Sequence, residues 1–270
     1  MRRQKKFYAW GYADEDLTPD EIHQIGLDEV ARIATSDVAM SATLLRAANS
    51  PAYSAGGAAV QTIGQAMNRL GLQHTAGVMT AFLARGALRV SAPQLQRFWE
   101  RSTKRALAMT HVAERLPGVS PDLARTYGLF CHVGMPVMMA GVKGYGGTLT
   151  EAMARQDRSF TQTENANHRT DHAVVGAIVA RTWRLPLDVA LAIRLHHDFT
   201  CLTDSGLGDT QRRLVAMGLI ADHLVHQHEG LPPLREWQRF GAACLGYLEV
   251  GEGEVNVWID ELHPAFEAVV

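Results

Sequence analysis

The sequence is poor in cysteine, with three in 270 residues. Cys131, Cys201 and Cys244 stand far apart and form no CxxC pair, so neither a thiolate zinc site nor a disulfide framework is indicated. A reducing compartment fits this composition best. We therefore expect a cytoplasmic protein that folds without disulfides.

Long apolar runs and an excess of charge of one sign are also missing. No uninterrupted apolar run reaches the roughly 18 residues of a membrane-spanning helix, and positions 7–20 carry no run of signal-peptide length. The 26 basic and 28 acidic residues give a formal net charge of −2. This balance provides no general attraction to nucleic acid or to an anionic membrane. We expect a soluble protein with neither as a partner.

Alternating strand patterns longer than a few residues are absent, whereas apolar residues recur with the helical period of 3.6. The pattern predicts an all-α protein with a tail at 1–16, an N-terminal helical bundle at 17–92 and a second helical bundle at 93–270. A capping box at Thr18–Glu21 and a cap at Ser36 begin the first helices. Thr62 caps a helix that ends at Gly71, where another follows.

The second bundle is predicted in the same way. Ser120 and Pro121 begin a helix that continues through His132 to Met138. The glycine-rich positions 141–147 are expected to form a turn, because they lack the lysine–hydroxyl pair of a phosphate-binding loop. Thr148–Glu151 is interpreted as a capping box, and the polar positions 155–169 as a surface loop. The helices after Pro232–Pro233 are expected to serve packing alone.

The central stretch, Asp171–Asp198, is predicted to form two helices joined near Pro186. Small residues at Ala173, Gly176, Ala177 and Ala180 form a stripe that another helix can approach closely. A short connection favours antiparallel packing of the two helices. His172 would then lie at the same end as His196 and His197. Three imidazoles placed together suit a metal or anion pocket, or its remains.

The order of motifs resembles a known family, the HDOD domain of bacterial signalling proteins. The matching segments are LLRAANSPAYS, IGQAMNRLGLQ, FWERS, YGLFCHVG, DHAVVGAIVARTW and AIRLHHD. They occur in the family's order over positions 17–227. The resemblance implies an N-terminal helical bundle joined to a bundle related to HD-type metal phosphohydrolases. It also implies a regulatory function, because HDOD domains are generally thought to lack hydrolase activity.

The resemblance also implies where a metal site would have been. An active HD hydrolase has an early histidine, a His-Asp doublet and a late aspartate. Here the early position matches Arg101, the doublet is His132-Val133, and the late aspartate is Asp222. The related HD-GYP phosphodiesterases use further histidines, which match His172, His196 and His197. Valine cannot ligate a metal, and an arginine places a fixed cation where a metal ion would sit.

These residues leave three hypotheses open. We expect a non-catalytic signalling module with a vestigial pocket and no metal or other cofactor, acting on partners such as sensor kinases or cyclic-dinucleotide enzymes. The first alternative is a phosphohydrolase that keeps one divalent transition metal on His132, His172, His196, His197 and Asp222. The second is a sensor that binds a nucleotide beside Arg101 and the histidines. Hydrogen bonds among buried polar groups would equally explain the cluster.

Overall fold

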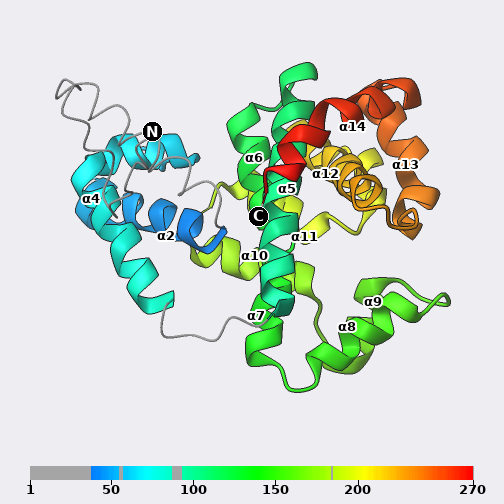
Figure 1. Ribbon diagram of the computed structural model, residues 1–270, viewed down its shortest axis with the longest axis horizontal. Coiled ribbons are helices and arrows are strands. Elements are labelled where there is room, and N and C mark those ends of the chain that lie inside the picture. The colour runs from blue at the N-terminus through cyan, green and yellow to red at the C-terminus, as the bar shows by residue number, and fades with distance from the viewer. Residues whose placement is uncertain (1–37, 55–56, 87–92, 184, 270) are drawn as a thin grey trace, which may run out of the picture. The chain divides into compact units, whose positions relative to one another are not determined.

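The computed structural model describes residues 38–54, 57–86, 93–183 and 185–269, which form helices and no strand (Figure 1). This confirms the predicted all-α class. The chain divides into two compact units, Met1–Arg89 and Val90–Val270. The predicted caps at Thr18–Glu21 and Ser36 lie outside the described residues. Within the described part of the chain, no helix is long and apolar enough to cross a membrane.

The first unit contains α2 (Val38–Ala48), the short α3 (Pro51–Ser54) and α4 (Ile63–Gly86). Thr62 caps α4 as predicted, since its Oγ1 accepts a hydrogen bond of 3.2 Å from the Gln65 backbone N–H. At Gly71 the helix is interrupted by a residue with φ 71° and ψ 166°. Glycine adopts this positive φ without steric cost. The predicted end of one helix and start of another at this residue is confirmed.

The second unit is built around α12 (Asp209–His228), which packs on α5 (Pro93–Arg115), α11 (Leu187–Leu195), α13 (Arg235–Leu248) and α14 (Glu252–Glu267). Its buried face includes Leu214, Ile220 and Leu224, each fully inaccessible to solvent. The other main helices cover this core. They also include α6 (Pro121–Phe130), α10 (His172–Thr182) and the 3₁₀ helix η1 (Phe199–Thr203).

The prediction of a single helix that continues through His132 is wrong. α6 ends at Phe130, and α7 (Gly134–Gly141) begins after a turn at 131–133. The turn is closed by hydrogen bonds from the Val133 N–H to the Phe130 carbonyl and from the Met135 N–H to the His132 carbonyl, both 2.9 Å. An apolar pattern is the same for one long helix or two short ones. Packing of α7 on α10 decides between them, and it places His132 in the turn.

The structure also corrects the segment after α7. α8 (Tyr145–Ala154) begins inside the glycine-rich positions, after Gly144 at φ 83°. Tyr145 is buried at 1% exposure, so its burial favours helix in a segment rich in glycine. Thr148 does not cap this helix. Its hydroxyl instead contacts His168 Nε2 at 2.7 Å.

The polar positions 155–169 contain a helix, α9 (Phe160–His168), and not only a loop. Ser159 and Gln162 form a capping box at its start. The helix carries one fully buried carboxylate, Glu164, on its inner side. This buried acid lies beside His172, which makes α9 part of the site described next.

Candidate metal centre

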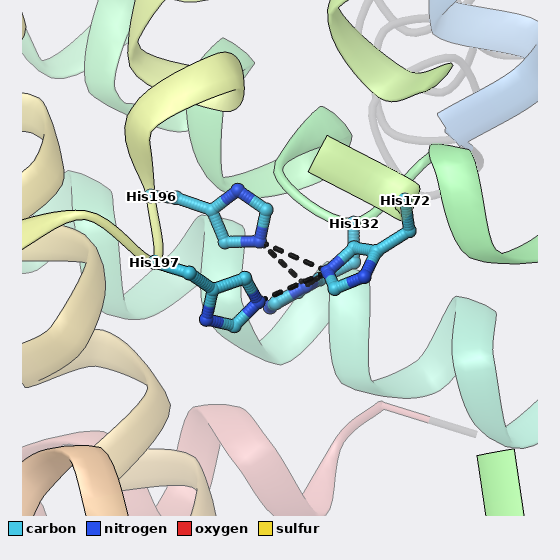
Figure 2. A group of neighbouring side chains, drawn as sticks. All are labelled: His132, His172, His196 and His197. Carbon is cyan, nitrogen blue, oxygen red and sulfur yellow. Dashed lines mark hydrogen bonds between the residues drawn. The ribbon is translucent and has the colours of Figure 1, made fainter. Parts of the chain in front are cut away.

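Four histidines from three helix ends meet in the second unit (Figure 2). His132 lies in the turn between α6 and α7, and His172 is the first residue of α10. His196 and His197 follow the last residue of α11. The sequence predicted that antiparallel packing of α10 and α11 would bring His172 to His196 and His197. The structure confirms this meeting.

Local features fix the start of α10. The Asp171 side chain accepts a 2.8 Å hydrogen bond from the Val174 N–H and caps the helix. Asn165 donates to the other Asp171 oxygen at 2.6 Å. Gly134 lies so close to α10 that an added Cβ would be 2.0 Å from the His172 carbonyl oxygen. Only a residue without a side chain permits this approach of α7 to the small-residue stripe of α10.

One nitrogen of each imidazole points to a common centre (Figure 2). His172 Nε2 lies 3.0 Å from His197 Nε2, 3.1 Å from His196 Nε2 and 3.3 Å from His132 Nδ1. His196 Nε2 and His132 Nδ1 are 3.2 Å apart. Nitrogens bound to one tetrahedral zinc at about 2.0–2.1 Å would be roughly 3.3–3.4 Å apart. These four separations therefore nearly match a four-coordinate site, and the ligand nitrogens all lie within 4.8 Å of one another.

The other nitrogen of each ring faces an oxygen acceptor. His172 Nδ1 is 2.7 Å from Glu164 Oε2, and His197 Nδ1 is 2.7 Å from Glu236 Oε1. His196 Nδ1 is 2.6 Å from the Ile193 carbonyl oxygen. His132 Nε2 is 3.3 Å from Asp222 Oδ2. Outer carboxylates and carbonyls of this kind orient metal-binding histidines and fix their tautomer.

The tautomers have a direct consequence at the centre. The acceptors assign the ring N–H of His172 and of His196 to Nδ1, because the Ile193 carbonyl only accepts and Glu164 Oε2 already accepts from the His172 backbone N–H. The two Nε2 atoms then carry lone pairs and face each other at 3.1 Å with no proton between them. His132 is assigned in the same way, with its lone pair on Nδ1. Such a cluster is relieved by a cation at its centre, which is either a proton or a metal ion.

Glu164 is held in place from α8 and α10. Tyr145 donates its hydroxyl to Glu164 Oε1, and the His172 backbone N–H donates to Oε2 at 3.2 Å. Burial raises the pKa of the Glu164 carboxyl, and these hydrogen bonds oppose that rise. The same contact raises the pKa of Tyr145, after the larger effect of burial.

The pKa values of the histidines favour a largely uncharged cluster. Burial lowers the pKa of His132 to about 3, and the Arg105 cation adds to the shift. Burial, followed by the nearby His197, holds the pKa values of His172 and His196 well below the ordinary value. Burial acts to lower the pKa of His197 as well, but the Glu236 carboxylate outweighs it and the net shift is upward. Neutral imidazoles are the form that binds metal.

Asp222 is paired with a guanidinium. Arg105 Nε donates to Asp222 Oδ1 at 2.6 Å, in a pair that is largely shielded from solvent. Burial acts to raise the pKa of Asp222, but Arg105 and His132 outweigh it and lower the pKa. The carboxylate is thus ionised, yet Arg105 already neutralises it. A metal ion at Asp222 would have to compete with this fixed cation.

The structure pairs Arg101 with a carboxylate outside the cluster and keeps Val133 beside His132. Arg101 donates from Nε to Glu229 Oε2 at 2.9 Å, and its side chain is 39% exposed. The guanidinium beside Asp222 belongs to Arg105, one helical turn later on α5. Val133 is buried at 1% exposure and precedes α7 as its N-cap, without a side-chain hydrogen bond. It lies next to His132 in the chain but has no polar atom to offer.

Sequence reasoning missed three residues that orient the cluster, namely Arg105, Glu164 and Glu236. The capping box at Ser159–Gln162 was a signal for α9, and hence for Glu164 on a helix. Glu236 lies in α13, which was expected to serve packing alone, and that expectation is wrong. No local pattern marks Glu236 or Arg105, because their partners are distant in the chain.

Comparison with known proteins agrees with the fold. The family model of the HDOD domain matches residues 21–199. This chain therefore belongs to the HDOD family. An uncharacterised protein of Treponema pallidum is 23% identical over 247 residues, which are 90% of this chain and 46% of that protein. The chain thus spans about half the length of this relative.

Two solved structures show the same arrangement of helices. The MmoQ response regulator of Methylococcus capsulatus aligns with a TM-score of 0.63 and 18% identity, over 90% of each chain. An HDOD domain protein of unknown function from Geobacter sulfurreducens aligns with a TM-score of 0.54 and 22% identity, over 95% of this chain and 88% of that one. At these identities the likeness concerns the fold alone.

Proposed function

We propose that this chain is a regulatory HDOD domain organised around one transition-metal ion held by His132, His172, His196 and His197, and that it does not hydrolyse phosphodiesters. The observation that carries the proposal is the 3.1 Å contact between His172 Nε2 and His196 Nε2. Both atoms carry lone pairs when their Nδ1–H groups donate to Glu164 and Ile193. A metal ion gives the three assigned lone pairs, together with His197 Nε2, a common acceptor, whereas a single proton serves only two.

The donor set suits zinc or another ion that prefers imidazole. It differs from a catalytic site in two ways. Catalytic zinc sites keep a position open for water, whereas four histidines complete a tetrahedral shell. A second metal would need the Asp222 carboxylate, which Arg105 occupies at 2.6 Å. When bound, the ion would supply a cross-link between the α6–α7 turn, the start of α10 and the end of α11.

Metal content and turnover test this proposal together. The protein is purified without chelator, dialysed extensively and analysed for zinc, manganese, iron and nickel. We expect about one tightly held equivalent, which is lost in His172→Asn. His226→Gln is the matched control, because the His226 ring hydrogen-bonds the Pro232 carbonyl at 3.2 Å and belongs to neither histidine group. Absence of metal even after zinc is supplied during expression would overturn the metal site. Turnover of a generic phosphodiester would overturn the non-hydrolytic assignment.

A second observation favours action on a protein partner. An apolar groove of about 220 Å³ lies between α10 and α11. Ile178 and Leu187 on its walls are 60% and 64% exposed. Arg181 and Arg194 also line it, are exposed, and have no carboxylate partner among the described residues. Apolar walls with two free cations fit an amphipathic helix that carries carboxylates along its flanks.

We assign this groove to a helix of a signalling protein, such as a sensor kinase or a cyclic-dinucleotide enzyme. A labelled helical peptide with leucines on one face and glutamates on both flanks serves as the probe. Fluorescence anisotropy should show binding to wild type and at least about tenfold weaker binding to Arg181→Glu/Arg194→Glu, a loss of about 1.4 kcal/mol. The same peptide with lysines should bind the charge-reversed variant better than wild type. Equal binding of both peptides to both proteins would exclude the assignment.

A further inference from the structure

A second group of metal-ligating side chains lies apart from the four-histidine cluster. It consists of His228, in the last turn of α12, with His263 and Glu267 on α14. One ligand atom from each residue lies within 4.8 Å of the others. All three residues follow the part of the chain that the family model matches, residues 21–199.

The contacts in this group place His263 at the Nδ1 edge of the His228 ring and Glu267 at its Nε2 edge. His228 Nδ1 and His263 Nδ1 are 3.2 Å apart, close to the roughly 3.3 Å separation of two nitrogens on one tetrahedral zinc. His263 and Glu267 are four residues apart on α14 and therefore lie on the same face of the helix. Glu267 Oε1 is 3.5 Å from His228 Nε2, longer than a good hydrogen bond. The carboxylate thus lies near His228 Nε2, and its exposed side chain has to turn toward the two Nδ1 atoms to share an ion with them.

The exposure of the three side chains determines whether an ion from solution can reach them. The His228 side chain is 5% exposed, while that of Glu267 is 65% exposed. The ring of His228 packs against Phe266, with centroids 5.0 Å apart, which fixes one ligand. His263 and Glu267 approach from the solvent side. An ion from solution can therefore reach the group without opening the core.

The positive charge of Lys104 opposes the binding of a metal ion at this group. Lys104 acts to lower the pKa of His228, after burial. The Lys104 ammonium is 3.7 Å from Glu229 Oε1, a carboxylate that it shares with Arg101. Glu267 adds a further negative charge at the group itself.

We propose that His228, His263 and Glu267 form a second, exchangeable divalent-metal site, selective for zinc-like ions, that fastens α14 to the end of α12. Two imidazoles and one carboxylate are ligands that zinc accepts. Three protein ligands leave a further position toward solvent, which water fills. The site is independent of the buried cluster, since the two groups share no residue.

Zinc titration by calorimetry tests the site. Wild-type protein is first dialysed so that only tightly held metal remains, and zinc sulfate is then added. We expect wild type to bind about one more equivalent than His263→Gln and Glu267→Gln. Both residues are exposed, so their replacement leaves the core intact, which circular dichroism checks. Glu261→Gln is the matched control, since Glu261 lies on α14 but pairs with His111 at 2.9 Å and Arg115 at 2.7 Å.

Thermal unfolding supplies a second measurement. Added zinc should raise the Tm of wild type and of Glu261→Gln by about 3 °C more than that of His263→Gln, because an ion that binds only the folded state stabilises it. Equal zinc uptake by wild type, His263→Gln and Glu267→Gln would overturn the proposal. Loss of the same equivalent in Glu261→Gln would also overturn it. The buried four-histidine cluster is measured separately, as the metal that remains bound after dialysis of wild type and is lost in His172→Asn.

Discussion

Replacing Gly134 with alanine tests the contact that brings His132 to His172. The added Cβ would lie 2.0 Å from the His172 carbonyl oxygen and 2.8 Å from the Gly176 backbone nitrogen. Ordinary contact begins at 3.4 Å, so the start of α7 must move by about 1.4 Å. Both opposing atoms belong to the backbone of α10 and cannot rotate away. We expect a loss of about 3 kcal/mol in the free energy of unfolding, at the upper end for overpacking.

Two other glycines calibrate this expectation. At Gly176 the nearest atom to an added Cβ is Ile193 Cγ2 at 3.0 Å, a side-chain methyl that can shift slightly. Gly176→Ala should therefore be less destabilising than Gly134→Ala. At Gly141, the last residue of α7, nothing lies within 4 Å of an added Cβ. Gly141→Ala should be neutral or slightly stabilising, because alanine loses less backbone entropy in a helix.

Urea unfolding measures the free energy of unfolding of the three variants and so their order of stability. The metal content after dialysis measures how each substitution affects the histidine cluster. Gly134→Ala should also lose metal, because moving α7 displaces His132 from the other three imidazoles. A Gly134→Ala variant as stable as wild type, with its metal retained, would show that α7 does not approach α10 in this way.

Three further predictions concern the residues around the cluster. Val133→Asp should lower the free energy of unfolding by about 1–3 kcal/mol, because it buries a carboxylate at a position that is 1% exposed. It should confer no phosphodiester hydrolysis while Arg105 holds Asp222, so measurable turnover by this single variant would contradict our placement of the blocking cation. Glu164→Gln should weaken metal binding by about 10–100-fold, measured by competition with a chelator, because an outer carboxylate on His172 is lost; unchanged affinity would show that this carboxylate does not orient the ring. Metal-free protein should lose stability as the pH falls from about 6 to 5, by about 1.4 kcal/mol per pH unit from His132 alone. The pKa of His132 is about 3 in the folded state, below the roughly 6.5 of the unfolded chain, so the unfolded state binds more protons over this range. The slope of unfolding free energy against pH should be shallower in His132→Asn, and identical slopes would refute the reasoning.

Local sequence determined the elements that depend on neighbouring residues. The cap at Thr62, the break at Gly71 and the start of α6 after Ser120 were all predictable, because a cap or a positive φ involves only residues a few positions apart. The meeting of His172 with His196 and His197 was predictable for a related reason. A short connection between two helices leaves few ways to pack them.

Tertiary structure decided what local pattern left open. Whether an apolar stretch continues as one helix through His132 depends on how closely α7 can approach α10 at Gly134. The helical state of the glycine-rich start of α8 depends on the burial of Tyr145. Neither cause can be recognised within a window of neighbouring residues.

The residues of the site, like the helices, were predictable from the sequence only in part. The sequence pattern by itself brought His172 together with His196 and His197, and the resemblance to the HDOD and HD families added His132 and Asp222. Only the folded chain showed that Arg105, and not Arg101, pairs with Asp222 across 117 positions of sequence. It also showed that Glu164 and Glu236 orient two of the imidazoles. The protonation and metal affinity of a buried histidine depend on the acceptor at its second nitrogen, and that acceptor comes from whichever helix the fold packs beside it.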